Sequence, residues 1–200
     1  MNTIGIIGAG AIGSAIAEAL WRKGIHAVVA NSRGPASLQK LVDRFGPTIQ
    51  AGTREEAAAQ EIVFVAVNWS KLSTALAGLP NFAGRIVIDT NNPLEGMPLN
   101  VADLGGRTSS EVFREWVPGA KVVKAFNHLK PILLSGDPRA EGGQRVLFYA
   151  GDDVAAKASV AQLIERLDFF GIDLGTLVTG GRLFQFPGGP LPSRNLVRYP

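Results

Sequence analysis

Residues 4–33 read IGIIGAGAIGSAIAEALWRKGIHAVVANSR, and this stretch predicts a strand, a tight turn, a helix and a second strand. The run 4–7 is short and apolar, as expected of a strand that is buried on both faces. Residues 8–13 match the G-x-G-x-x-G pattern, and the helix that we expect over residues 11–23 begins inside it. The glycine pattern alone is weak evidence. Because it stands here between a strand and a helix, it predicts a dinucleotide-binding turn.

Each glycine of this turn has a separate physical role. Gly8 allows the tight turn, Gly10 lets the backbone approach a pyrophosphate, and Gly13 lets the helix pack closely on the strand. The free N–H groups and the positive end of the helix dipole then attract the anion. The candidate pyrophosphate site therefore comprises Gly8, Ala9, Gly10, Ala11, Ile12 and Gly13.

The end of the second strand indicates which dinucleotide binds. Folds that bind NAD usually carry Asp or Glu about 20 residues past the glycines, where the carboxylate bonds the ribose 2′-hydroxyl. Here the corresponding residues are Asn31, Ser32 and Arg33, and none of them is acidic. A hydroxyl and a guanidinium bind a 2′-phosphate, which a carboxylate would repel. This turn favours NADP, although a polar turn with a solvated Arg33 is the alternative.

The composition of the whole chain limits its class. The 200 residues are 46% hydrophobic and 18% charged, which suits one α/β domain. We expect a single NADP-binding domain over residues 1–180 and a Gly/Pro-rich tail over 181–200. The chain has no Cys, no apolar run of membrane-spanning length and no signal peptide, so a cytoplasmic protein is expected. A net charge of +3 with dispersed basic residues makes nucleic acid a poor partner.

Strands and helices alternate along the rest of the chain. This order predicts a Rossmann-type, doubly wound α/β fold, with a mostly parallel sheet between two helical layers. Further strands are expected over 26–30, 48–51, 61–67, 85–89, 121–125 and 145–150, with a last edge strand over 172–178. Helices are expected over 35–45, 69–77 and 154–170, with a brief one opening at Thr53 and with Gly171 ending the longest.

Polar segments follow three of these strands, at the edge where open parallel sheets bind ligands. Val67, Asn68 and Trp69 are candidates to flank the pyrophosphate and ribose, although Trp69 equally suits packing against the sheet. Thr90, Asn91 and Asn92 could present polar groups to the nicotinamide, or simply form a turn. Asn127 and His128 are the candidate catalytic residues, whereas the other histidine, His26, is interpreted as structural.

The residue types also discriminate between mechanisms. We find no Ser-His-Asp order, no metal-ligand cluster and no paired carboxylates at usable spacing. Reduction of a carbonyl requires a proton donor, typically Lys, His or Tyr. Hydride exchange between two cofactors mainly requires that their rings stack, because proximity and orientation supply the rate.

Several segments in this order carry a family resemblance: IGIIGAGAIGSAIAEAL, VANSRGP, DTNNPL, PGAKVVKAFNHL, YAGDDVAAKASVAQLIERL and FFGIDLGTLVTGGRL. The chain resembles NADP-dependent oxidoreductases that use the deazaflavin coenzyme F420, and is similar to the cytosolic reductase domain of six-transmembrane metalloreductases. The resemblance implies NADP on residues 8–13, Ser32 and Arg33. It also implies a flavin-like acceptor near the nicotinamide, lined by the turns at 68–69 and 126–128.

The chain departs from the deazaflavin enzymes in one turn. Those enzymes carry a histidine where this chain has Asn127, and AFN is closer to the metalloreductase branch. The leading hypothesis is hydride transfer between NADPH and a deazaflavin or flavin-type acceptor, with a homodimer as the candidate assembly. The alternatives are an NADPH-dependent reductase of a small imine or carbonyl compound and a non-catalytic NADP-binding sensor.

Overall fold

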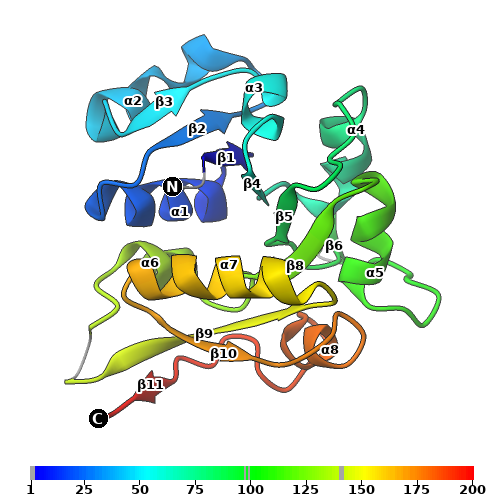
Figure 1. Cartoon of the computed structure of the whole chain (residues 1–200). Helices are drawn as coiled ribbons and strands as arrows, with labels where there is room; N and C mark the ends of the chain where they lie inside the picture. The colour runs from blue at the N-terminus through cyan, green and yellow to red at the C-terminus, as the bar shows by residue number, and fades with distance from the viewer. Residues whose placement is uncertain (1–2, 97, 99, 140–141) are drawn as a thin grey trace.

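The computed structural model describes residues 3–96, 98, 100–139 and 142–200. Within these residues, nine strands form one sheet in the order β10-β9-β8-β5-β4-β1-β2-β3, with β11 paired to β9 (Figure 1). The strands of this sheet are β1 (Ile4–Ile7), β2 (Ala27–Ala30), β3 (Ile49–Ala51), β4 (Ile62–Val65), β5 (Ile86–Asp89), β8 (Lys121–Ala125), β9 (Gln144–Gly151), β10 (Phe170–Asp173) and β11 (Val197–Arg198). β6 (Leu94–Glu95) and β7 (Asn100–Val101) form a separate antiparallel pair.

Most of the sheet is parallel. The strands from β3 through β2, β1, β4 and β5 to β8 all run in one direction. β9 is antiparallel to β8, and β10 runs parallel to β9. The expected Rossmann-type fold is therefore confirmed. The carboxyl ends of β1, β2, β4, β5 and β8 lie along one edge of the sheet, as the candidate site requires.

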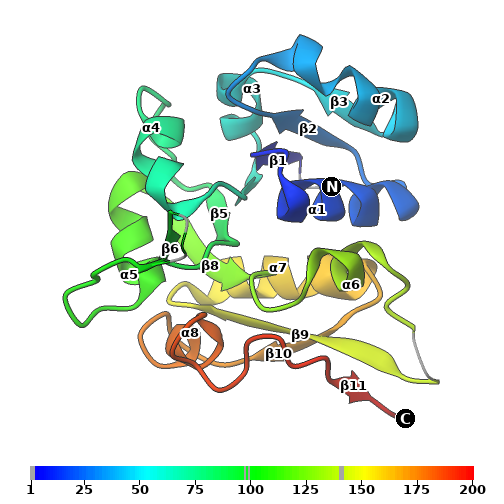
Figure 2. The same ribbon diagram turned by 180° about the vertical axis from the view of Figure 1, so that it is seen from behind.

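Helices cover both faces of the sheet (Figures 1 and 2). Alternate strand residues explain this: Ile6 and Phe64 belong to one buried cluster, whereas Ile7 and Val65 belong to another. The first cluster includes residues of α1 (Ala11–Arg22), α2 (Gln39–Phe45), α6 (Pro131–Ser135) and α7 (Val154–Arg166), and the second includes residues of α3 (Arg54–Ala58), α4 (Leu72–Leu76) and α5 (Ser109–Phe113). Short 3-10 turns precede α2 and α4 and follow α5, at Pro35–Leu38, Trp69–Lys71 and Arg114–Trp116. Among the described residues, no helix has the length and apolar character needed to cross a membrane.

The longest helix is shorter than expected. α7 ends at Arg166 and not at residue 170, because Asp168 adopts a left-handed conformation with φ of 66°. The N–H groups of Asp168 and Phe169 turn back to the carbonyls of Glu165 and Ile164, which terminates the helix. Gly171 does not end the helix, since it lies in β10 opposite Leu147. The expected strand over 172–178 was likewise misplaced, because β10 ends at Asp173.

The chain beyond residue 180 packs on the sheet. Residues Gly180–Phe184 form α8, and Phe184 is fully buried in a third cluster with Val146, Phe148 and Ala150 of β9. β11 pairs with the beginning of β9, so the last residues extend the sheet. The division of the chain into a domain over 1–180 and a tail stays a prediction.

Candidate functional site

The glycine turn has the shape expected of a pyrophosphate cradle. Gly8 has a φ of +108°, and a Cβ on it would lie 2.2 Å from the carbonyl oxygen of Ala66. A Cβ on Gly13 would lie 1.9 Å from the carbonyl oxygen of Gly8. A Cβ on Gly10 would meet nothing within 4 Å, so this residue borders open space. Gly8 and Gly13 are required by the fold, whereas Gly10 faces outward, where a ligand would lie.

The first turn of α1 has groups available for an anion. Gly10 occupies the N-cap position, where no side chain caps the helix, and the first turn contains no acidic residue. Backbone N–H groups of a first helical turn have no partner within the helix. The twelve-residue helix α1 therefore presents unopposed donors and its positive dipole end beside Gly10.

The turn after β2 exposes its basic side chain. Asn31 shapes this turn, because its Oδ1 accepts from the backbone N–H of Arg33 at 2.9 Å and from the hydroxyl of Ser37 at 3.1 Å. Ser32 and Arg33 are both exposed. Within the described part of the chain, the Arg33 guanidinium has no hydrogen bond or ion pair. It is thus available for a phosphate at the carboxyl end of β2.

Thr90 and Asn91 use their side chains to join β5 to β4. The hydroxyl of Thr90 and the Nδ2 of Asn91 both donate to the carbonyl of Val65, at 2.9 and 3.0 Å. Asn91 Oδ1 accepts from the backbone N–H of Val67 at 3.1 Å. Both side chains are buried, so they hold the turns after β4 and β5 in place.

The segment after β4 divides into a buried and an exposed part. Trp69 is 6% exposed, and its ring meets that of Trp116 edge-on at 5.2 Å, which is the packing role that the sequence left open. Asn68 is exposed beside it, and Val67 is half-buried. A ligand at this edge could reach Asn68 and the backbone of the segment, but not the face of Trp69.

Sequence analysis did not identify the buried ion pair beneath this edge. Lys124 Nζ lies 3.3 Å from Asp89 Oδ2, and both side chains are fully buried. Nζ also donates to the carbonyl of Asn91 at 2.9 Å and to the hydroxyl of Ser109 at 3.1 Å. Burial lowers the pKa of Lys124, and the Asp89 carboxylate opposes that shift. The available signal was a lysine inside the buried run KVVKA, near an aspartate that ends the neighbouring run RIVID.

Asp89 also organises the turn that follows it. Its Oδ1 accepts from the backbone N–H and the Nδ2 of Asn91, both at 2.9 Å, and its Oδ2 accepts from the hydroxyl of Ser110 at 2.5 Å. Ser109 and Ser110 open α5, which Thr108 and Glu111 cap reciprocally. Thr108-x-x-Glu111 has the spacing of the cap at Thr53 and Glu56, a signal that could have located α5 from the sequence.

The two predicted catalytic residues differ in their surroundings: Asn127 makes polar contacts, whereas His128 lies among aromatic rings. Asn127 Nδ2 donates to Asn92 Oδ1 at 3.0 Å and to the carbonyl of Phe184 at 2.8 Å, which places Asn127 between the turn after β5 and α8. His128 is 3% exposed, and its ring packs at 4.8 Å from Phe148 and 6.1 Å from Phe184. Burial lowers the pKa of His128 to about 4. A catalytic role for either residue stays a prediction.

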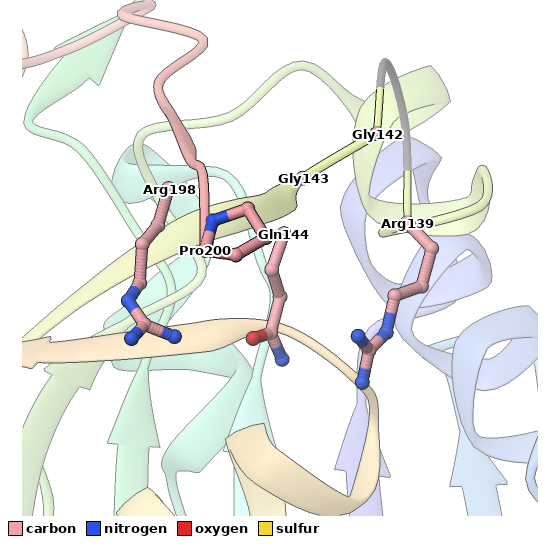
Figure 3. Close-up of a pocket in the computed structure, with 6 residues that line it drawn as sticks. All are labelled: Arg139, Gly142, Gly143, Gln144, Arg198 and Pro200. Atoms are coloured by element: carbon pink, nitrogen blue, oxygen red, sulfur yellow. The ribbon is translucent and has the colours of Figure 1, made fainter.

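Two surface hollows lie away from these turns. One, of about 630 Å³, is shown in Figure 3, where Arg198 and Arg139 extend on either side of Gln144; its remaining lining residues are Gly142, Gly143 and Pro200. The other, of about 240 Å³, lies at the amino ends of β1 and β2 and includes the exposed His26. Neither hollow contains a residue of the candidate cofactor site. Among the described residues, no group of three or more His, Cys, Asp or Glu side chains could hold a metal.

Comparisons with known proteins relate this arrangement to reductases. Residues 3–93 match the family model described as NADP oxidoreductase, coenzyme F420-dependent. A solved structure of a protein from Arthrobacter sp. FB24, assigned as an F420-dependent NADP-reductase, is 30% identical with a TM-score of 0.77, over 88% of this chain and 86% of that one. A hypothetical protein from Sinorhizobium meliloti is 44% identical with a TM-score of 0.94, over 99% of this chain and 96% of that one.

The chain is also similar to part of a longer protein and to a solved structure of lower sequence identity. The metalloreductase STEAP3 of Rattus norvegicus is 30% identical over 191 residues, which is 95% of this chain but only 37% of that protein. The chain thus spans little more than a third of this relative. A reductive aminase from Aspergillus terreus has a TM-score of 0.62 at 21% identity, over 90% of this chain and 57% of that one, and shares the fold.

Proposed function

The chain belongs to the family of NADP oxidoreductases that depend on coenzyme F420, and from this membership we propose that it transfers a hydride between NADPH and a deazaflavin or flavin-type acceptor. The observation that carries the proposal is the glycine turn. Gly8 and Gly13 leave no room for a side chain, Gly10 borders open space, and the first turn of α1 has unopposed N–H groups. Such a cradle fits a pyrophosphate.

The turn after β2 supports NADP over NAD. Asn31 holds the backbone of Arg33, and the Arg33 guanidinium is exposed without a partner among the described residues. We propose that Ser32 and Arg33 bind the 2′-phosphate by charge-assisted hydrogen bonds. Bound NADPH supplies the hydride. The remaining proposed contacts are Ala9, Ala11 and Ile12 beside the pyrophosphate. Toward the ribose and nicotinamide they are the exposed Asn68, the backbone of Val67 and Trp69, and the turn formed by Thr90, Asn91 and Asn92.

The chemistry at the carboxyl end of β8 supports a ring-to-ring hydride transfer. Lys124 is fully buried, and its ammonium group is shared among Asp89, Asn91 and Ser109. His128 is enclosed by aromatic rings, and its lowered pKa keeps it neutral at pH 7. Neither side chain is placed to hand a proton to a carbonyl substrate. Transfer between two stacked rings depends instead on their orientation, which Asn92 and Asn127 would maintain.

Rapid mixing tests the reaction directly. NADPH-loaded protein is mixed in turn with F420, FMN and FAD, and the loss of the absorbance of reduced nicotinamide is followed. We expect reduction of at least one of these ring systems. If none is reduced and a cyclic imine is reduced instead, the imine reductase alternative holds. If NADPH binds tightly and nothing is reduced, the sensor alternative holds.

The proposal includes a homodimer and a cytoplasmic location. Exposed apolar side chains on the C-terminal segment, such as Leu183 at 40% and Leu196 at 43%, support self-association. Sedimentation velocity over a range of protein concentrations would measure the oligomeric state. A single monomeric species throughout that range would contradict the dimer without affecting the proposed reaction.

A further inference from the structure

Three consecutive residues of the C-terminal segment are bound to three separate elements of the candidate site. The carbonyl of Phe184 accepts from Asn127 Nδ2 at 2.8 Å, in the turn after β8. Gln185 Oε1 accepts from the backbone N–H of Ser109 at 2.6 Å, at the start of α5. The N–H of Phe186 donates to Asn92 Oδ1 at 2.9 Å, in the turn after β5.

Contacts on both sides fix this segment further. The Phe184 ring is fully buried against His128 and Phe148. Beyond Phe186 the chain folds back on itself, and the N–H of Leu191 donates to the carbonyl of Leu183. The N–H of Ser193 then donates to the carbonyl of His128, in the turn after β8. Figures 1 and 2 show α8 at the same end of the molecule as α5, in agreement with the Gln185 contact. The segment is therefore anchored to the sheet.

Phe186 presents its ring to solvent in spite of this anchoring. The residue is 45% exposed, whereas Phe184 is fully buried. Single exposed apolar side chains are common on protein surfaces and by themselves indicate nothing. Phe186 differs because its backbone is held by Asn92, at the carboxyl end of β5, where open α/β sheets bind ligands. A fixed aromatic ring at that edge is a prepared contact for a planar ligand.

The position of Phe186 points to the acceptor and not to the NADP molecule. The family match covers residues 3–93, which include every turn that we propose to hold NADP, and ends before this segment. The backbone N–H of Phe186 donates to Asn92, in the turn after β5, and Asn92 is the last residue along the chain among the proposed cofactor contacts. Its ring comes from outside residues 3–93, so it is suited to contact the acceptor beside the bound cofactor.

We propose that Phe186 forms one face of the acceptor subsite and stacks on the planar ring system of a deazaflavin or flavin. This inference rests on the proposed function, because the acceptor ring must lie against the nicotinamide held by the same turns. Asn92 and Asn127 act as positioning residues, because Asn92 holds the backbone of Phe186 and Asn127 holds that of Phe184. A planar tricyclic ring suits a fixed aromatic side chain, since the phenyl ring can stack with an offset on part of the larger ring face.

Binding measurements test the subsite without turnover. F420, FMN and FAD are titrated into NADP⁺-loaded protein, and the ligand fluorescence gives the Kd. We expect Phe186→Ala to raise the Kd of the tightest ligand about tenfold, which corresponds to about 1.4 kcal/mol. Phe186→Trp should retain the affinity. Tyr199→Ala is the matched control, because Tyr199 is an exposed aromatic residue of the same C-terminal segment at 59% exposure.

The outcomes separate this inference from the proposed function. An unchanged Kd in Phe186→Ala, or a dimer that dissociates in this variant while the Kd stays the same, overturns the subsite. Binding of NADP⁺ without any binding of the three ring systems also overturns it, and leaves cofactor binding intact. If calorimetry shows that the unaltered protein does not bind NADPH at all, the proposed function itself is contradicted.

Discussion

The ammonium group of Lys124 lies 3.3 Å from the carboxylate of Asp89, and neither side chain is exposed to solvent. This pair joins the carboxyl ends of β8 and β5 and holds the carbonyl of Asn91. Through Asn91 it also reaches the N–H of Val67, so one buried pair fixes two of the turns at the cofactor edge. The contribution of this pair should be measurable as a change in the free energy of unfolding.

Lys124→Met should destabilise the protein strongly. The substitution leaves the Asp89 carboxylate buried without its counter-ion, which typically costs about 3–5 kcal/mol. Chemical denaturation would measure the change in the free energy of unfolding. The double variant Asp89→Asn/Lys124→Met removes both charges and should recover a large part of the loss. Equal stability of the single and double variants would show that the two charges are not coupled.

Gly10→Ala and Gly13→Ala should separate cofactor binding from folding. A methyl group on Gly10 meets nothing within 4 Å, so the free energy of unfolding should change by less than about 1 kcal/mol. NADPH affinity should nevertheless fall at least about tenfold, because the backbone can no longer approach the pyrophosphate. Gly13→Ala should lower both stability and affinity, since its Cβ would lie 1.9 Å from the carbonyl oxygen of Gly8. Calorimetry and thermal unfolding together distinguish the two effects, and full NADPH affinity in Gly10→Ala would argue against the cradle.

Asn92→Ala should release the backbone of Phe186. The variant removes the oxygen that accepts from the Phe186 N–H and from Asn127 Nδ2, and leaving such donors unpaired costs about 1–3 kcal/mol. Hydrogen exchange followed by mass spectrometry should show faster exchange in peptides that contain residues 184–186. Asn100→Ala, in the exposed strand β7, is the control and should leave that exchange unchanged. Identical protection in both variants would mean that the segment is held by other contacts.

His128 should make the protein less stable in mild acid. Burial lowers the pKa of His128 from 6.5 to about 4, so the unfolded chain binds a proton more readily than the folded protein between these values. Stability due to this group is therefore complete above pH 6.5 and declines as the pH falls toward 4, by about 3 kcal/mol in all. Denaturation at several pH values should give a smaller decline for His128→Leu than for the unaltered protein. His26→Ala, at an exposed position, should keep the full decline; equal slopes in all three proteins would contradict the buried, neutral His128.

The local patterns were sufficient for the central strands and insufficient for the end of the longest helix. Short apolar runs such as 4–7 and 86–89 are strands because they are buried on both faces. Leu167 continues the apolar helical spacing of Val160, Leu163 and Ile164 past Arg166, where the helix ends. The end depends on Asp168, whose carboxylate pairs with Lys23 and Arg139 from distant parts of the chain. Such contacts are not visible in a local pattern.

The same distinction applies to the site. The turns that follow the strands were identified because parallel strands bring their carboxyl ends together. Which side chains remain free could not be read from the turns, since Thr90 and Asn91 are occupied by Val65 of the adjacent strand. The contact of residues 184–186 with Asn92 and Asn127 joins segments that lie far apart in the sequence. Only the folded structure shows that the C-terminal segment borders the site.

Calorimetric titration of the unaltered protein and of Arg33→Ala with NADPH and with NADH tests the central claim most directly. We expect a preference for NADPH of at least about tenfold in the unaltered protein, because the exposed Arg33 guanidinium is free to bind the 2′-phosphate. Arg33→Ala should lose about 2 kcal/mol of NADPH binding and little NADH binding. Arg139→Ala, an exposed arginine beside the distant hollow of Figure 3, should behave as the unaltered protein does. Equal affinity of the unaltered protein for NADPH and NADH, unaffected by Arg33→Ala, would contradict the account.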